Sequence, residues 1–226
     1  MADVALVCGG SGALGSAVVR AFLARGDVVV SAGRSAATVT QAPGQAQLRS
    51  ELVDLTEPDQ VEALWDRLAD EGALPRWLVN AAGGFRGGTV AETDAEDYRF
   101  LQQINLDATW WSCQAAARRL SSGGAIVNVA ARPALAGGKG AAAYAVSKAA
   151  VLRLTQVLSD ELKERRVRVN AVLPSVMDTP GNRASISSER MGDSVPTDDV
   201  AAVIAFLCSD QARVVSGAAI PVYGWA

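Results

Sequence analysis

The sequence contains no histidine among its 226 residues. Histidine is the commonest general base near neutral pH and a frequent zinc ligand, so Ser-His-Asp hydrolases and most zinc enzymes are excluded, and we expect no metal site. Cysteine is scarce as well, because Cys8, Cys113 and Cys208 are too few and too widely spaced for a disulfide framework or a metal cluster. We therefore expect reduced, buried thiols and proton chemistry on another type of side chain.

Long apolar runs and an excess of positive charge are also missing. No segment reaches the roughly 18 apolar residues of a membrane helix, and the start MADVALVCGG lacks the basic region of a secretory signal. We expect a cytoplasmic protein that does not bind membranes. The net charge of -3 and the pI near 5.1 offer no basic patch for a phosphate backbone, so nucleic acid is not an expected partner. A small-molecule substrate is expected instead.

Short runs of Val, Ile and Leu alternate with longer segments of helical period, the pattern of βαβ units around a mostly parallel sheet. The predicted strands lie near 3–8, 28–33, 47–53, 77–81, 124–130, 167–173 and 218–223. The predicted helices lie near 13–25, 57–71, 94–120, 144–164 and 197–208. We expect one α/β domain over residues 1–226, a doubly wound Rossmann-type fold with a central seven-stranded sheet.

Three local signals refine this prediction. Thr56 with Asp59 is typical of a capping box, and Thr197 is typical of a helix N-cap. The polar stretch 175–196 predicts a long loop, and a loop of that length in a compact domain is usually functional.

A glycine-rich turn follows the first predicted strand directly and leads into an Ala-rich helix. Glycine there permits a tight turn and lets main-chain N–H groups and the helix N-terminus approach a pyrophosphate. An ordinary βα turn is the alternative, but the position after the first strand favours a dinucleotide site. The expected cofactor contacts in this turn are Gly9, Ser11, Gly12, Ala13, Leu14 and Gly15.

The end of the second strand indicates which dinucleotide is bound. NAD-binding folds commonly place an acidic residue there for the ribose 2′-hydroxyl, whereas this chain has Gly33 followed by Arg34. A guanidinium suits a 2′-phosphate, so NADP(H) is favoured, with NAD(H) possible and a solvated turn cation as the alternative for Arg34. Asp54 and Leu55, after the third strand, are expected near the adenine.

Tyr144 and Lys148 are four residues apart in a segment of helical period, so both project from one face. An ammonium near a phenol favours the phenolate, and we expect it to lower the pKa of Tyr144 from its usual value of about 10. Tyr144 would then serve as an acid and base near neutrality.

With these residues the chain resembles a classical short-chain dehydrogenase/reductase over essentially its whole length. The matching pieces, in order, are CGGSGALG, NAAG at 80–83, Asn105 in QQINLDATWW, IVNVA at 126–130, YAVSK, RVNAVLP and DTP at 178–180. The resemblance implies a catalytic group of Tyr144, Lys148 and Asn105, in which Asn105 supports a proton-relay water and Lys148 also holds the nicotinamide ribose. It further implies cofactor contacts at Asn80, Ala81, Ala82, Gly83, Pro174 and Thr179.

One position departs from the family pattern. The family carries a serine thirteen residues before the tyrosine, where its hydroxyl holds the substrate carbonyl oxygen, and this chain has Ala131. Loss of one donor to a developing oxyanion costs on the order of 10²–10³ in rate. Ser147 does not obviously replace it, because its offset on the helix directs it away from the face of the tyrosine.

Three hypotheses follow. In the first, the chain is an NAD(P)(H)-dependent oxidoreductase that acts on a small carbonyl or alcohol. In the second, it reduces a pteridine-like or C=N substrate that needs no serine. In the third, it binds a dinucleotide without catalysis. The second is supported by similarity to the quinonoid dihydropteridine reductase type in GGxGALG, in AGGFRGG at 82–88 and in LPSVMDTPGNR at 173–183, although that NADH-using type has an acidic residue where this chain has Gly33. The residues expected to line the substrate site are Phe85, Ala131, Tyr144, Met177 and Arg183. By the family resemblance, the helix near 144–164 is expected to pair across subunits in a homotetramer or dimer.

Overall fold

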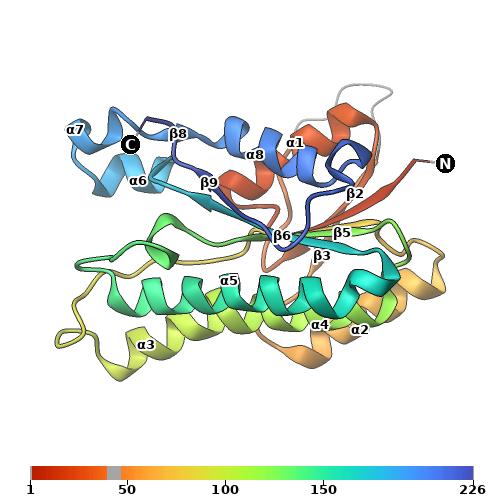
Figure 1. Ribbon diagram of the computed structural model, residues 1–226, viewed down its shortest axis with the longest axis horizontal. Coiled ribbons are helices and arrows are strands. Elements are labelled where there is room, and N and C mark those ends of the chain that lie inside the picture. Colours follow the sequence, from red (N-terminus) through yellow and green to blue (C-terminus); the bar gives the residue numbers. More distant parts are fainter. Residues whose placement is uncertain (1, 40–46, 226) are drawn as a thin grey trace.

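The computed structural model describes residues 2–39 and 47–225, apart from the side chain of Arg190 (Figure 1). Its centre is a seven-stranded sheet in the order β3-β2-β1-β4-β5-β6-β9, and every neighbouring pair is parallel. The strands are β1 (Val4–Cys8), β2 (Val28–Gly33), β3 (Leu48–Leu52), β4 (Trp77–Asn80), β5 (Ala125–Val129), β6 (Arg168–Pro174) and β9 (Ala219–Val222). The predicted doubly wound, seven-stranded sheet is confirmed.

Helices cover both faces of the sheet (Figure 1). One layer contains α1 (Ala13–Arg25) and α8 (Thr197–Leu207), and the other contains α2 (Pro58–Asp70), α4 (Ala108–Arg119) and α5 (Ala142–Leu162). Side chains of a strand alternate between these layers: Val7 of β1 packs in the core cluster with α1 and α8, and its neighbour Leu6 packs in the cluster with α2 and α4. The inner strands β1, β4 and β5 are mostly apolar because both of their faces are buried, whereas the edge strand β3 carries Arg49, Ser50 and Glu51.

The carboxyl ends of the strands gather at one edge, on the left in Figure 1. β1, β4, β5 and β6 end there at Cys8, Asn80, Val129 and Pro174. In open α/β sheets, ligands bind at this edge, where the loops after the strands converge. The predicted cofactor and substrate residues follow these strand ends, so the fold brings them to one side of the molecule.

Two predicted segments have a different local structure. The single helix expected over 94–120 consists of α3 (Ala95–Leu101), a π-helical turn (Gln102–Asp107) and α4. The stretch 175–196 is not one long loop: it contains β7 (Met177–Asp178), α6 (Pro180–Ser185), α7 (Ser188–Met191) and β8 (Val195–Pro196). β7 pairs in parallel with β8, a contact between residues far apart in that stretch, and Thr179 caps α6.

Both predicted caps are wrong. α2 begins at Pro58 with Glu57 as its N-cap, because the hydroxyl and amide of Thr56 both donate to the carboxylate of Asp54. Thr197 is the first residue of α8 and not its cap, since Pro196 occupies the cap position. The predicted thiols are confirmed as buried and free in Cys8, Cys113 and Cys208. Among the described helices, none has the length and apolar character needed to cross a membrane.

Candidate active site

The glycine turn after β1 is closed so tightly that two of its positions exclude any side chain. Gly9 has φ 83°, and a Cβ there would lie 2.6 Å from the amide nitrogen of Ala82. A Cβ on Gly15 would lie 2.0 Å from the carbonyl oxygen of Gly9. α1 starts with Gly12 as its N-cap and without a side-chain cap, so the amides of its first turn are open to a ligand. A helix N-terminus of this kind fits a pyrophosphate.

Polar groups gather beside this turn at the end of β2. Ser35 donates a hydrogen bond of 2.9 Å to the hydroxyl of Ser11, and Arg34, which precedes Ser35 in the chain, is exposed. The pKa of Asp54 lies below its usual range, because the amide and hydroxyl of Thr56 donate to it and, more weakly, because of the charge of Arg34. The side chain of Leu55 is buried in the core, so only its backbone reaches this edge.

The segment after β4 contributes backbone and little side chain. The side-chain amide of Asn80 is buried and donates a 2.8 Å hydrogen bond to the side-chain oxygen of Asn128 in β5. The side chain of Asn80 therefore links two neighbouring strands of the sheet. Ala82 packs on Gly9 as described above. A Cβ on Gly83 would lie 2.8 Å from Asn105 Oδ1 and 3.2 Å from Lys148 Nζ, which places the backbone of Gly83 directly beside both.

Asn105 is fully buried inside the π-helical turn 102–107. Its side chain both accepts from the amide of Gly84 and donates to the carbonyl of Gly84, each at 3.1 Å. Its side-chain amide also donates a 3.2 Å hydrogen bond to the hydroxyl of Ser147. That hydroxyl in turn donates a 2.8 Å hydrogen bond to the backbone carbonyl of Tyr144. Asn105 therefore ties the loop after β4 to the first turns of α5. Turns of π type are frequent at functional sites.

Tyr144 and Lys148 lie on the first turns of α5, four residues apart. Burial raises the pKa of Tyr144 to about 12 and lowers the pKa of Lys148 to about 8. The expectation that the lysine lowers the pKa of the tyrosine is thus wrong for this structure. The pKa of Tyr144 is raised because burial of the phenol disfavours its charged form. The ammonium of Lys148 donates its 2.8 Å hydrogen bond to the backbone carbonyl of Val129 and not to the phenol.

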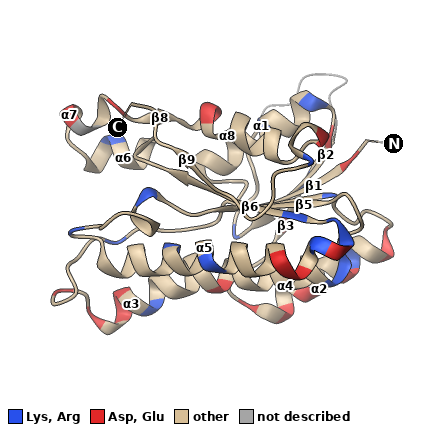
Figure 2. Ribbon diagram, in the orientation of Figure 1, with Lys and Arg blue, Asp and Glu red and all other residues tan. Residues whose placement is uncertain are grey.

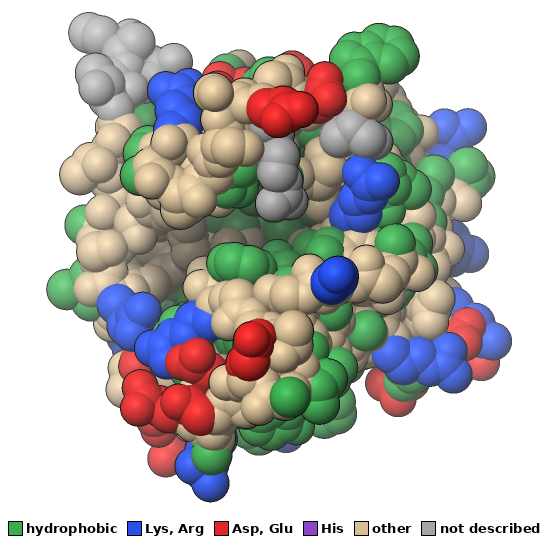
Figure 3. Space-filling model, turned by 90° about the vertical axis from the view of Figure 1, so that its left-hand side faces the viewer, with side chains coloured by type: hydrophobic (Ala, Val, Ile, Leu, Met, Phe, Trp, Pro, Cys, Tyr) green, Lys and Arg blue, Asp and Glu red, His purple; other side chains and the backbone are tan. Residues whose placement is uncertain are grey.

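Phe85 and Tyr144, two of the residues predicted to line the substrate site, are in contact. The ring of Phe85 meets the ring of Tyr144 edge-on, with centroids 5.0 Å apart and an interplanar angle of 77°. Phe85 is 64% exposed, so its other face is open. Ala131 is buried and begins the short turn Arg132–Ala134. Figure 3 shows that this face of the molecule is hollowed between an upper and a lower lobe, with hydrophobic side chains in the wall.

The residues predicted after β6 are held by local contacts. The hydroxyl of Thr179 accepts a 3.2 Å hydrogen bond from the amide of Asn182, and Arg183 forms a two-pronged ion pair with Asp178 at 2.5 and 2.7 Å. Met177 packs against the core cluster of α1 and α8, and Pro174 is buried at the end of β6. Of the predicted substrate residues, Phe85 and Tyr144 are in direct contact.

Comparison with known proteins gives a consistent result. The family model for enoyl-(acyl carrier protein) reductases matches residues 10–224. Meso-2,3-butanediol dehydrogenase from Serratia marcescens is 31% identical, over 99% of this chain and 94% of its own length. A short-chain type dehydrogenase/reductase from Mycobacterium ulcerans superposes with TM-score 0.89 at 28% identity, covering 98% of this chain and 88% of that one. A blue fluorescent protein from a metagenomic library, solved in complex with NADPH, superposes with TM-score 0.87 at 30% identity, covering 98% and 96%.

The chain belongs to the short-chain dehydrogenase/reductase family. It is an NAD(P)-dependent oxidoreductase, as the sequence motifs indicate.

Two buried polar residues of this dehydrogenase/reductase were not identified from its sequence as parts of the site. Ser147 is the hydroxyl partner of Asn105, and Asn128 links Asn80 to the hydroxyl of Thr155 at 2.9 Å. A signal for Asn128 was present, since it is a polar residue inside an apolar strand that both helical layers cover. Ser147 had a weaker signal, because a serine three residues after Tyr144 fits many helix surfaces.

Proposed function

We propose that the chain transfers a hydride between NADP(H) and a small carbonyl or alcohol, with Tyr144 as the proton donor and acceptor and Lys148 as the assisting cation. One observation carries this proposal: Lys148 is only 4% exposed, one helical turn after Tyr144 and beside the backbone of Gly83. Burying an ammonium is costly, and strongly perturbed ionisable groups gather at functional sites.

The residues present fit the cofactor. The first-turn amides of α1, at Ala13 and Leu14, and the positive helix end would hold the pyrophosphate, and Lys148 would hold the nicotinamide ribose. When bound, the nicotinamide ring supplies or accepts the hydride. Thr179 would meet the carboxamide end through its backbone, because its hydroxyl caps α6.

The preference for NADP(H) is proposed from the end of β2. Arg34 is exposed and forms no ion pair within the described residues, and Gly33 precedes it where an acidic side chain would repel a 2′-phosphate. The hydroxyls of Ser11 and Ser35 lie beside each other at the same place. The similar protein solved with NADPH supports this choice.

In the direction of reduction, Tyr144 acts as the acid. Its raised pKa of about 12 keeps the phenol protonated at neutral pH, so a proton is available for the substrate oxygen. The positive charge of Lys148 stabilises the phenolate that results. Asn105 fixes the loop at Gly84 and the helix at Ser147, and we propose that it also supports the water that returns a proton through Lys148.

A small secondary alcohol or its ketone is the proposed substrate class. The relative from Serratia marcescens is named for meso-2,3-butanediol, which supports a compact substrate. Phe85, edge-on to Tyr144 and otherwise open, would supply an apolar wall.

Ala131 favours a second candidate. Its methyl group stands where the family pattern has a hydroxyl for the substrate oxygen, and a pteridine-like or C=N substrate would not need that hydroxyl. Tyr144 and Lys148 would then deliver the proton to nitrogen in place of oxygen.

We further propose a homo-oligomer, a tetramer or dimer. Trp110 of α4 and Val146 and Val157 of α5 are large hydrophobic residues with exposed side chains on neighbouring helices of one layer. Association of two copies through this layer would cover them.

The decisive experiment compares Tyr144→Phe with the native chain, using NADPH and NADH against panels of ketones, vicinal diones and quinonoid pterins. Tyr144→Phe should lower kcat about 10²–10⁴-fold without weakening cofactor binding measured by tryptophan fluorescence. Tyr98→Phe, which alters an exposed tyrosine on α3, is the matched control and should keep full activity. Unchanged turnover by Tyr144→Phe on every substrate found would overturn the mechanism.

A further inference from the structure

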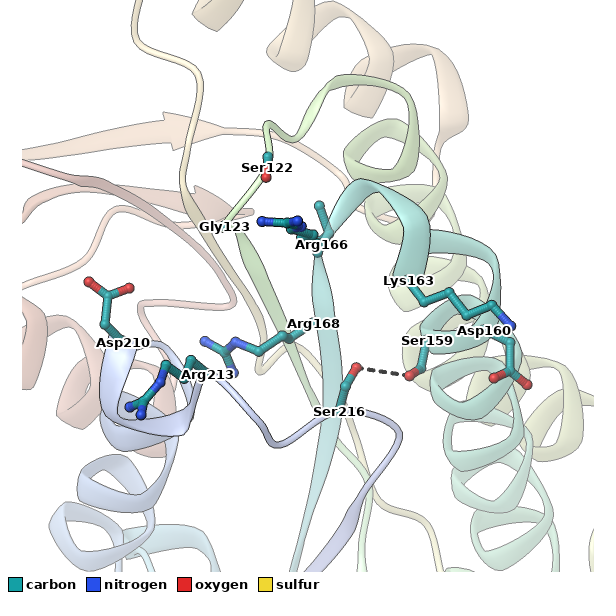
Figure 4. A pocket seen from close by; sticks show the side chains of 11 residues that line it. Ser122, Gly123, Ser159, Asp160, Lys163, Arg166, Arg168, Asp210, Arg213 and Ser216 are labelled. Carbon is teal, nitrogen blue, oxygen red and sulfur yellow. Dashed lines mark hydrogen bonds between the residues drawn. The ribbon is translucent and has the colours of Figure 1, made fainter.

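A cavity lies at the opposite edge of the sheet from the candidate active site. Its volume is about 530 Å³, and it opens where β6 begins, between the end of α5 and the segment 210–216. Figure 4 shows its lining, including the hydrogen bond between Ser159 and Ser216. Strand β6 spans seven residues from Arg168 to Pro174, so the cavity is separated from the active-site edge by about 20 Å of strand.

The lining carries an excess of positive charge. Lys163, Arg166, Arg168 and Arg213 face two acidic residues, Asp160 and Asp210. Asp210 already pairs with Arg76 outside the cavity at 2.6 Å. None of the four cations forms an ion pair with a carboxylate in the part of the chain that the structure describes. Figure 2 shows Lys and Arg on the segment that leads from α5 into β6. This surplus is local, because the protein as a whole has a net charge of -3.

Arg168 is the buried member of this group. Arg168 is 9% exposed, and its guanidinium donates hydrogen bonds to two backbone carbonyls, that of Ser209 at 3.1 Å and that of Val215 at 3.5 Å. In Figure 4 its side chain extends toward the segment of Asp210 and Arg213. A buried cation without a carboxylate is costly, so an anion bound in the cavity would offset part of that cost.

Arg166 lines the cavity as the C-cap of the short turn Lys163–Arg165 that follows α5, and its backbone amide donates to the carbonyl of Lys163. It has φ 54°, and it is the one non-glycine residue with positive φ among those described. This left-handed conformation suits glycine and costs an ordinary residue about 1 kcal/mol or more. Figure 4 places the Arg166 side chain beside Gly123 and Ser122 at the cavity wall. The left-handed conformation is that of a helix C-cap, and it leaves the Arg166 side chain in the lining of the cavity.

We infer that this cavity binds a small phosphate-bearing anion. Guanidinium groups pair with phosphate oxygens in a two-pronged manner, and three of the four cations are arginines. A volume of about 530 Å³ exceeds that of one phosphate and suits a phosphorylated metabolite. The site is separate from the hydride-transfer chemistry and does not depend on it.

Inorganic pyrophosphate is the probe for this site, titrated into the cofactor-free full-length chain by calorimetry at constant ionic strength. Arg166→Gly removes the charge and relieves the backbone conformation, so the variant should fold with an unchanged or higher Tm. It should weaken pyrophosphate binding about tenfold or more, and Arg213→Gln should weaken it in the same direction. Arg153→Gln removes an exposed arginine of α5 that does not line the cavity, and it should bind as the native chain does.

Pyrophosphate could instead bind at the glycine turn of the cofactor site, and Gly15→Ala, which disrupts that turn, distinguishes the two sites. If the cavity is the site, Gly15→Ala keeps the Arg166-dependent binding. The inference is overturned if Arg166→Gly and Arg213→Gln both bind as the native chain does, if Gly15→Ala alone abolishes binding, or if sodium chloride of equal ionic strength produces the same heat and the same shift in Tm.

Discussion

The ammonium of Lys148 donates a 2.8 Å hydrogen bond to the carbonyl of Val129, the last residue of β5. Ala131 follows only two residues later. The same strand end therefore fixes the buried cation and places a methyl group where the family pattern has a hydroxyl. The phenol and the cation are both present near this strand end, and position 131 has no hydroxyl.

Lys148→Met should stabilise the cofactor-free protein while it abolishes activity. Burial lowers the pKa of Lys148 from its usual 10.5 to about 8, which corresponds to a cost of roughly 3 kcal/mol at neutral pH. Methionine fills a similar volume without a charge, but it leaves the carbonyl of Val129 without this partner. A net gain of about 1–2 kcal/mol in the free energy of unfolding is expected from urea titrations. Lys139→Met, at an exposed lysine, should change this free energy little.

The gain in the free energy of unfolding of Lys148→Met over the native chain should become smaller as the pH rises. Below pH 8 both the folded and the unfolded chain carry the proton on Lys148, and the full cost is present. Between about pH 8 and 10.5 the unfolded chain binds this proton and the folded chain does not, so the native protein gains stability relative to Lys148→Met as pH rises. The difference between the two should therefore shrink from pH 7 to pH 10. A constant difference across that range would mean that desolvation of the ammonium is not its source.

Ala131→Ser tests what the missing hydroxyl means. If the natural substrate is a simple ketone, the added hydroxyl should raise kcat/KM by about 10²–10³-fold, the usual range for one donor to a developing oxyanion. Ala134→Ser, three residues further along the same turn, is the control and should give no gain. An unchanged kcat/KM in Ala131→Ser with every active substrate would favour a C=N substrate.

Gly15→Ala should disrupt the cofactor turn, whereas Gly33→Ala should not. A Cβ on Gly15 would lie 2.0 Å from the carbonyl oxygen of Gly9, which forces the backbone to move. A Cβ on Gly33 would have its nearest neighbours at 3.9 Å, an ordinary contact. We expect Gly15→Ala to lose about 1–3 kcal/mol of stability and to weaken NADPH binding at least tenfold in a fluorescence titration. Equal binding by the two variants would show that the turn is not the pyrophosphate site.

The sheet and the glycine turn could be predicted because their signals are local. Apolar runs such as VALVC predict strands that are buried on both faces, and the glycines follow the first of them directly. The spacing of Tyr144 and Lys148 likewise places both on one face of a helix, whatever surrounds them. Each of these features depends on residues close together in the chain.

Other features depend on contacts between distant residues and could not be predicted in this way. The π-helical turn at 102–107 places Asn105 between Gly84 and Ser147, which are separated from it by 21 and 42 positions. β7 forms only because Met177 pairs with Val195. The raised pKa of Tyr144 is set by burial in the assembled fold, and a spacing of four residues carries no information about that burial.

Arg34→Ser should lower the affinity for NADPH about 10–100-fold and leave that for NADH nearly unchanged. A charge-assisted hydrogen bond to a phosphate contributes about 1.5–3 kcal/mol, and only NADPH carries the 2′-phosphate. Arg34 is exposed, so its removal should not affect folding. Arg153→Ser is the matched control for the loss of one surface charge. The measurement is a pair of fluorescence titrations at low and high salt: the NADPH preference of the native chain should fall with salt, and a native chain that binds NADH more tightly would refute the assignment of Arg34.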